Sequence, residues 1–201
     1  MIEWYKPYGV REAYVFPFTE STATWGTGIK LRNMIMFKLT PKHDTDIMPV
    51  YGRDEKGLSV VRGGDIEMQL GGVQNDTDEV MTGRTSRTSG SGATEKRTRD
   101  IGDDSLPYFG LAVALKTKND IGDVHIYCPN VMLSSLLALD LTETAKFSVP
   151  NVPAMLFGLS SEAGDRYRLW YEVELATKTA LGSDFEAMLT ANIPDGSYLI
   201  T

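Results

Sequence analysis

The chain has 201 residues, with 20 Lys and Arg against 27 Asp and Glu, which gives a formal net charge of −7. This length suits one domain, and a content of 42% hydrophobic and 23% charged residues excludes both wholesale disorder and a fibrous repeat. The acidic balance argues against a protein whose main task is to grip phosphate backbones. We predict a single domain covering residues 1–201.

The start of the chain, Met-Ile-Glu-Trp-Tyr-Lys-Pro, has no basic region, apolar block or small-residue cleavage site, so we expect no secretory signal. The apolar stretches are too short to cross a bilayer. Cys128 is the single cysteine, which excludes an intramolecular disulfide and a cysteine-based zinc site within one chain. We therefore expect a protein that is made and kept in a cytoplasm and is stabilised by packing or by partners.

Apolar and polar residues alternate along much of the chain, which is the pattern of half-buried strands. The clearest run is 165–175, in which Tyr167, Leu169, Tyr171, Val173 and Leu175 are predicted to share one face. The segment 65–70 alternates in the same way between two glycine pairs. Further strands are predicted at 12–18, 29–39, 47–51, 111–116, 123–128, 146–149 and 154–159. The apolar run 131–141 suits a buried helix or a strand equally.

Two short helices interrupt the strands. Ser183-Asp-Phe-Glu186 is a capping-box pattern, and Pro194 ends the helix that it begins. Asp76 to Glu79 gives a weaker helix start, and Gly83 stops that helix after one to two turns. Neither helix is long enough to form a layer, so the predicted fold class is all-β with one or two short flanking helices.

The segment 82–105 differs from the rest of the chain, because it is rich in Ser, Thr, Gly and charge and has Ile101 as its only large aliphatic residue. We predict a long polar loop here. A loop of this length in a compact domain is usually either disordered or committed to binding. Glu95 is its only acidic residue before position 100, whereas its basic residues are Arg84, Arg87, Lys96, Arg97 and Arg99.

Signatures of catalysis and metal binding are weak. His43 lies between Pro41 and two aspartates, and this polar stretch is better explained as a solvated hairpin tip than as a metal site. His125 and Cys128 could be drawn as a base and a nucleophile, but residues three apart on a strand point to opposite faces. We predict no catalytic residues, no metal and no cofactor, and we do not expect an enzyme.

The order of several segments is informative. The strand 9–16 is followed by a strand pair and by Val50-Tyr-Gly-Arg-Asp-Glu-Lys-Gly-Leu58, a short turn with tyrosine and aspartate. Next come the glycine-bounded strand 64–71, the acidic helix start 76–79, the glycine-containing strand 107–113, and a C-terminal hairpin from 147–159 to Lys178. This order, over roughly residues 9–180, resembles the major tail protein family of long-tailed bacteriophages. The run 131–141 and the tail from Gly182 onward depart from it.

The resemblance implies a β-sandwich or open-barrel subunit that closes into hexameric rings, which stack into a tail tube around a lumen that conducts DNA during ejection. The implied partners are further copies of the chain and other tail proteins (terminator, tape measure, distal tail), with no membrane and no specific DNA binding. The implied location is the virion tail, after assembly in the host cytoplasm. The polar loop would reach a neighbouring subunit or ring. Alternation makes four residues candidates for the lumen surface: Glu67, Gln69, Glu172 and Glu174.

Two other interpretations stay open. A soluble β-sandwich binding module would use the long loop to hold a ligand or receptor and would remain monomeric or dimeric. Another ring-forming tail component, such as a terminator or baseplate protein, is the closer alternative. Self-assembly into rings or tubes separates the tail proteins from the binding module.

Overall fold

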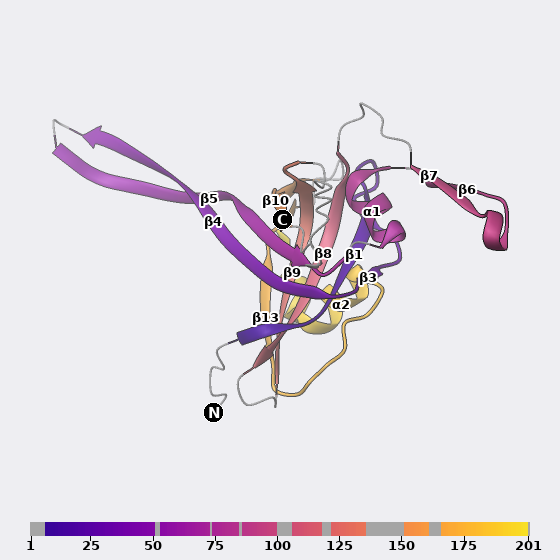
Figure 1. Cartoon of the computed structure of the whole chain (residues 1–201). Coiled ribbons are helices and arrows are strands. Elements are labelled where there is room, and N and C mark those ends of the chain that lie inside the picture. Colours follow the sequence, from indigo (N-terminus) through magenta and orange to yellow (C-terminus); the bar gives the residue numbers. More distant parts are fainter. Residues whose placement is uncertain are drawn as a thin grey trace.

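The computed structural model describes residues 7–50, 53–72, 74–84, 86–99, 106–117, 122–135, 151–160 and 166–200. The fold is all-β with two short helices, as predicted (Figure 1). The strands are β1 (Pro7–Thr19), β2 (Thr24–Trp25), β3 (Ile29–Leu31), β4 (Met34–Val50), β5 (Arg53–Leu70), β6 (Ser86–Ser89), β7 (Lys96–Arg99), β8 (Tyr108–Thr117), β9 (Asp123–Leu133), β10 (Asn151–Leu156), β11 (Leu159–Ser160), β12 (Arg166–Tyr167), β13 (Tyr171–Leu175) and β14 (Leu199–Ile200). The helices are α1 (Asn75–Thr82) and α2 (Phe185–Asn192).

Most strands belong to one antiparallel sheet with the order β2-β1-β8-β9-β10-β5-β4. One edge of β9 pairs with β8, whereas the other edge is divided between two strands. Its residues 123–127 pair with β13, and its residues 131–133 pair with β10. The sheet therefore branches at β9, and β10, β5 and β4 form a second layer.

The core has two apolar clusters, one on each face of the central strands. On β9, Val124, Ile126 and Cys128 belong to the larger cluster, whereas Tyr127 belongs to the smaller one. Strands β4, β5 and β10 and residue Met81 of α1 contribute to the larger cluster, and α2 contributes to the smaller one. Because β8 is buried on both faces, its sequence is a nearly continuous apolar run, whereas β9, which is also buried on both faces, includes the buried polar residues Asp123, His125 and Asn130.

The two helices lie close to their predicted positions. Helix α1 ends at Gly83, which adopts φ 69° and donates its N–H to the carbonyl of Glu79. Helix α2 is capped by Asp184, whose Oδ1 accepts the N–H of Ala187 at 3.0 Å. The prediction of Ser183 as the cap was therefore wrong by one residue, because the side chain one position later reaches the free amide.

Two predictions for the stretch from residue 29 to residue 51 were wrong. The strand predicted at 29–39 is divided between β3 and β4 by a turn in which Asn33 has φ 63°. The hairpin tip predicted around Pro41 and His43 is the middle of β4, since these residues pair with Gly64 and Val61 of β5. Proline is tolerated there because β4 is the last strand of the sheet.

The run 165–175 is also not one strand. Its first part, β12, joins β11 and β14 in a small separate sheet, and its second part, β13, pairs with β9. Tyr167 and Tyr171 pack on the smaller cluster, but Leu169 packs on the larger one, which corrects the prediction of a common face. In the ambiguous run, 131–133 belong to β9, whereas 136–141 and the strand predicted at 146–149 lie outside the described residues.

We expect Gly110→Ala to lower the free energy of unfolding by roughly 1–3 kcal/mol, because it overpacks the core. A Cβ at Gly110 in β8 would lie 2.8 Å from the Cδ1 atom of Trp25. The indole cannot easily retreat, since it contacts the rings of Phe18, Tyr167 and Phe185. Urea unfolding followed by tryptophan fluorescence measures the change. The matched control is Gly9→Ala, whose Cβ meets nothing within 4 Å, and equal destabilisation of both variants would contradict the prediction.

Candidate assembly surface

The β4–β5 hairpin extends far beyond the core and is here called the long arm. Strand β5 pairs with β10 only from Gly64 to Gln69. From Lys42 and Gly63 outward, β4 and β5 pair with each other and with no other strand of the described part. Figure 1 shows this hairpin reaching well away from the body. A two-stranded ribbon is only marginally stable in water by itself, so the long arm is a surface suited to a partner.

A second hairpin, β6–β7, is here called the basic arm. Its strands pair from Ser86–Arg99 to Ser89–Lys96, and Gly90 and Gly92 adopt positive φ where the chain turns. Figure 1 shows it leaving the body on the side opposite to the long arm. The long polar loop predicted at about 82–105 is therefore a β-hairpin over residues 86–99, while positions 100–105 lie outside the described residues.

The predicted basic residues lie on or beside this arm. Arg87 and Lys96 are exposed, and the register places them on the same face. Arg84 is half-buried at the base of the arm. Arg97 and Arg99 belong to β7, but their side chains lie outside the description. The arm thus carries accessible positive charge on a chain that is acidic as a whole.

Of the four lumen candidates, Glu67 and Gln69 lie on β5 and point away from the larger cluster, into which Ile66 and Met68 project. Glu67 is not an isolated carboxylate, because Lys38 of β4 lies 3.2 Å from its Oε1 atom. Lys42 makes a similar pair with Asp65 at 2.7 Å. Sequence reasoning missed both lysines, whose positions follow only from the β4–β5 register.

The other two lumen candidates, Glu172 and Glu174, lie on β13 opposite Ile126 and Val124 of β9. Glu172 is exposed and Glu174 is half-buried. Within the described residues, β13 pairs with no strand other than β9, so its outer edge is open. The structure therefore puts the four candidates in two separate pairs, on the β4–β5–β10 layer and on the β13 edge.

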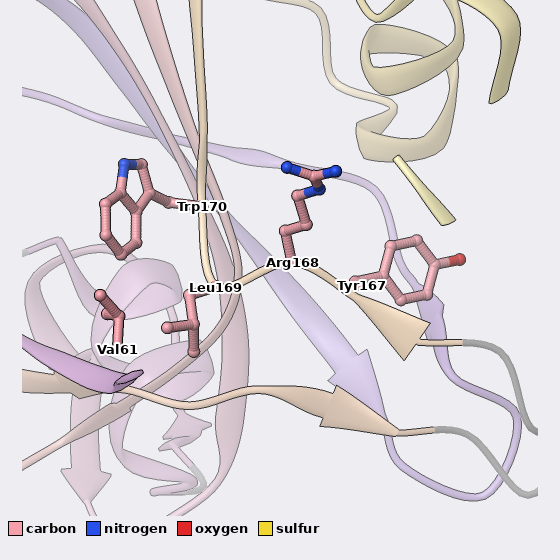
Figure 2. A pocket seen from close by; sticks show the side chains of 5 residues that line it. All are labelled: Val61, Tyr167, Arg168, Leu169 and Trp170. Atoms are coloured by element: carbon pink, nitrogen blue, oxygen red, sulfur yellow. The ribbon is translucent and has the colours of Figure 1, made fainter. Parts of the chain in front are cut away.

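An apolar groove of about 440 Å³ lies where the long arm leaves the body (Figure 2). Val61 of β5 and the segment between β12 and β13 line it. Figure 2 shows Leu169 and Trp170 gathered beside Val61, with Arg168 extending away from them. Val61 and Trp170 are distant in the sequence, and no pattern in the sequence indicates that they meet.

A buried polar network, also missed by sequence reasoning, fastens the segment after β13 to the sheet. An Nη atom of Arg11 lies 2.9 Å from Asp123 and 3.3 Å from Glu12, and it also donates to the carbonyl of Thr179. The N–H of Leu181 donates to Glu12 at 2.8 Å. Although burial tends to raise it, the pKa of Glu12 is lowered by this N–H, by Lys30 and by the charge of Arg11.

His125 and Cys128 lie on opposite faces of β9, as predicted, and cannot act together. The Nδ1 atom of His125 lies 2.9 Å from the Tyr127 hydroxyl, which accepts a hydrogen bond from Asn192. Burial lowers the pKa of His125, raises the pKa of Tyr127 to about 12, and raises the pKa of the Cys128 thiol. These shifts reflect burial in a packed interior.

Within the described ranges, no group of three or more His, Cys, Asp or Glu residues is placed to hold a metal ion. The helices of the described part are also too short and too polar to cross a membrane. No protein-family model matches the chain, and a comparison with curated proteins finds no match. The function has to be inferred from the geometry of the arms and edges.

Acid is expected to destabilise the protein through His125. Because burial holds its folded pKa below the ordinary value of about 6.5, the unfolded state binds the proton first as the pH falls below that value. The free energy of unfolding therefore decreases from about pH 6.5 down to the folded pKa. Glu12, whose pKa is also lowered, adds a further loss at more acidic pH.

Urea unfolding at about pH 7 and about pH 5.5 measures this effect. His125→Gln should lose less stability over this interval than the wild type. His43→Gln, at an exposed position, is the matched control, because it removes the other histidine of the chain and leaves His125 in place. An unchanged pH dependence in His125→Gln would show that another group is responsible.

Proposed function

We propose that the chain is a structural subunit of a bacteriophage tail tube that assembles as stacked hexameric rings around a DNA-conducting lumen. The observation that carries the proposal is the pair of hairpin arms, which leave the body on opposite sides (Figure 1). Beyond its root, each arm is a two-stranded hairpin that pairs with no further strand of the described part. Such arms gain stability when a neighbour packs against them.

Open strand edges support the same proposal. Strand β4 ends the order of the large sheet, and β13 is open along its outer edge in the described part. Exposed edges invite uncontrolled pairing unless they are covered. Two different edges of one subunit suit a head-to-tail contact, which closes a ring when the rotation between subunits is correct. Ring closure removes both edges at once.

The charge distribution fits a conduit for DNA. A lumen that lets a duplex slide should not bind phosphates tightly, and the net charge of −7 meets that requirement. Glu172 and Glu174 are the stronger candidates for the lumen surface, because the outer edge of their strand pairs with no other described strand. Glu67 is partly neutralised by Lys38, so Glu67 and Gln69 fit a mixed surface better than a strongly acidic one.

The alternative of a soluble binding module is favoured by one observation, the apolar groove beside Val61 and Trp170. In that case the groove would hold a ligand and the chain would stay monomeric or dimeric. Another tail component, such as a terminator or baseplate protein, would also form rings, but those rings would not stack into a tube.

The purified chain at high concentration is expected to form hollow tubes or six-fold rings. Negative-stain electron microscopy, with the mass in solution measured on the same sample, tests this. Rings that do not stack would favour a terminator or baseplate component. Monomers alone at all concentrations would favour the binding module.

Replacing residues 86–99 with Gly-Gly is expected to abolish tubes and leave a folded monomer. The subunit should fold because this arm contributes no residue to either apolar cluster. Microscopy and thermal unfolding give the two readouts, and Ser89→Ala, an exposed change on the same arm, is the matched control. If the chain without residues 86–99 formed normal tubes, the basic arm would not be needed for assembly.

A further inference from the structure

A hollow of about 600 Å³ lies between the end of β1 and the segment after β10, and is here called the Asn130 pocket. Its lining combines aromatic rings, one buried amide and one carboxylate. The residues are Phe18, Glu20, Ser21, Tyr108, Asn130, Gly158 and Leu159. None of these described lining residues is basic. It is separate from the groove beside Val61 and from the four lumen candidates.

The side chain of Asn130 carries a hydrogen-bond acceptor that has no partner among the described residues. The residue is 6% exposed, and its Oδ1 atom is buried without a hydrogen-bond partner in the described structure. A buried amide oxygen is nearly always paired, because an unpaired acceptor loses its water without compensation. Its backbone is fixed by the N–H of Phe157, which donates to the carbonyl of Asn130 at 3.0 Å. A ligand that donates to Oδ1 would complete the site.

The other residues that line the pocket indicate the charge and the shape of the group that would donate to the Oδ1 atom of Asn130. The exposed carboxylate of Glu20 favours a cation. The rings of Phe18 and Tyr108 are held by contacts with Trp25 and Phe157, at centroid distances of 5.5 Å and 5.8 Å. A planar cation that donates several hydrogen bonds and stacks on aromatic rings is a guanidinium. An ammonium group would satisfy the charge but not the stacking.

We propose that the Asn130 pocket receives the guanidinium of Arg87 from the basic arm of a second copy of the chain. This inference rests on the proposed self-assembly and names the receiving site for one arm. Charge complementarity supports it, since the arm is basic on an otherwise acidic chain. A second copy is the source because the arm points away from its own body (Figure 1), and none of the described lining residues belongs to the arm.

A charge exchange tests the contact in the full-length chain. Glu20→Arg and Arg87→Glu should each raise the concentration needed for assembly at least roughly tenfold. An equimolar mixture of the two variants should assemble again, because each arm then meets a pocket of opposite charge. Lys96→Glu, a reversal on the same face of the arm, should not be rescued by Glu20→Arg. Absence of rescue in the first mixture, or equal rescue in the second, overturns the proposal.

Two further variants test the chemistry of the pocket. Asn130→Leu removes the acceptor and keeps a similar size, and it should weaken assembly while the thermal unfolding midpoint shows that the subunit is folded. Arg87→Lys keeps the charge and loses the planar fork, so it should weaken assembly as well. Wild-type assembly by folded Asn130→Leu and by Arg87→Lys would contradict recognition of a guanidinium.

A cysteine cross-link separates this proposal from the proposed tube. Ser21 at the pocket and Thr88 beside Arg87 are both exposed, whereas Cys128 is fully buried and serves as the internal control. The chain carrying Ser21→Cys and Thr88→Cys should form disulfides between copies on a non-reducing gel. Cross-linked dimers without rings or tubes would support the pocket and contradict the tube. Tubes without this cross-link, or a cross-link within one chain, would overturn the pocket and leave the tube standing.

Discussion

Strand β9 pairs with β8 along one edge and shares its other edge between β13 and β10, and the two apolar clusters lie on its two faces. Because side chains alternate along a strand, each residue of β9 is committed to one cluster. A shift of one residue in its register would move Cys128 and Tyr127 to the wrong sides together. The branched sheet, the packing of α2 and the position of the β13 edge all depend on this register.

The two arms differ from the body of the chain in how their strands are paired and covered. The body buries apolar side chains on both faces of β8 and β9 and needs no neighbour for its core. The arms are two-stranded hairpins that pair with no further strand of the described part. In the proposed tube, the core would let each subunit fold by itself, and the arms would provide the surfaces that join one subunit to the next.

Local sequence patterns predicted where many of the strands and helices lie. They could not predict which strands pair with one another. Alternation at 65–70 and the helix from Asp76 to Gly83 were confirmed, because they depend on neighbours in the chain. Pro41 looked like a turn, since only its pairing with Gly64 shows that the strand continues. The hairpin at 86–99 was missed because it has no apolar face, and apolar periodicity was the signal used to find strands.

Contacts between distant segments of the chain also explain which residues of the candidate sites sequence reasoning missed. Glu67 and Glu172 were found by alternation, but the lysine beside Glu67 comes from another strand. The network around Arg11 joins residues from β1, β9 and the segment after β13, and the Asn130 pocket joins equally distant parts. One sequence gives no signal for contacts at such separations.

The attachment of α2 has a consequence for the order in which the domain can fold. Thr179 and Leu181 donate hydrogen bonds to Asp123 and Glu12, which lie 56 and 169 residues earlier in the chain, and the helix that follows covers the smaller cluster. Contacts this distant in sequence form slowly. Until this segment docks, one apolar face of β1, β8 and β9 has no cover. A chain in which α2 has not yet docked therefore exposes an apolar surface that the folded domain hides.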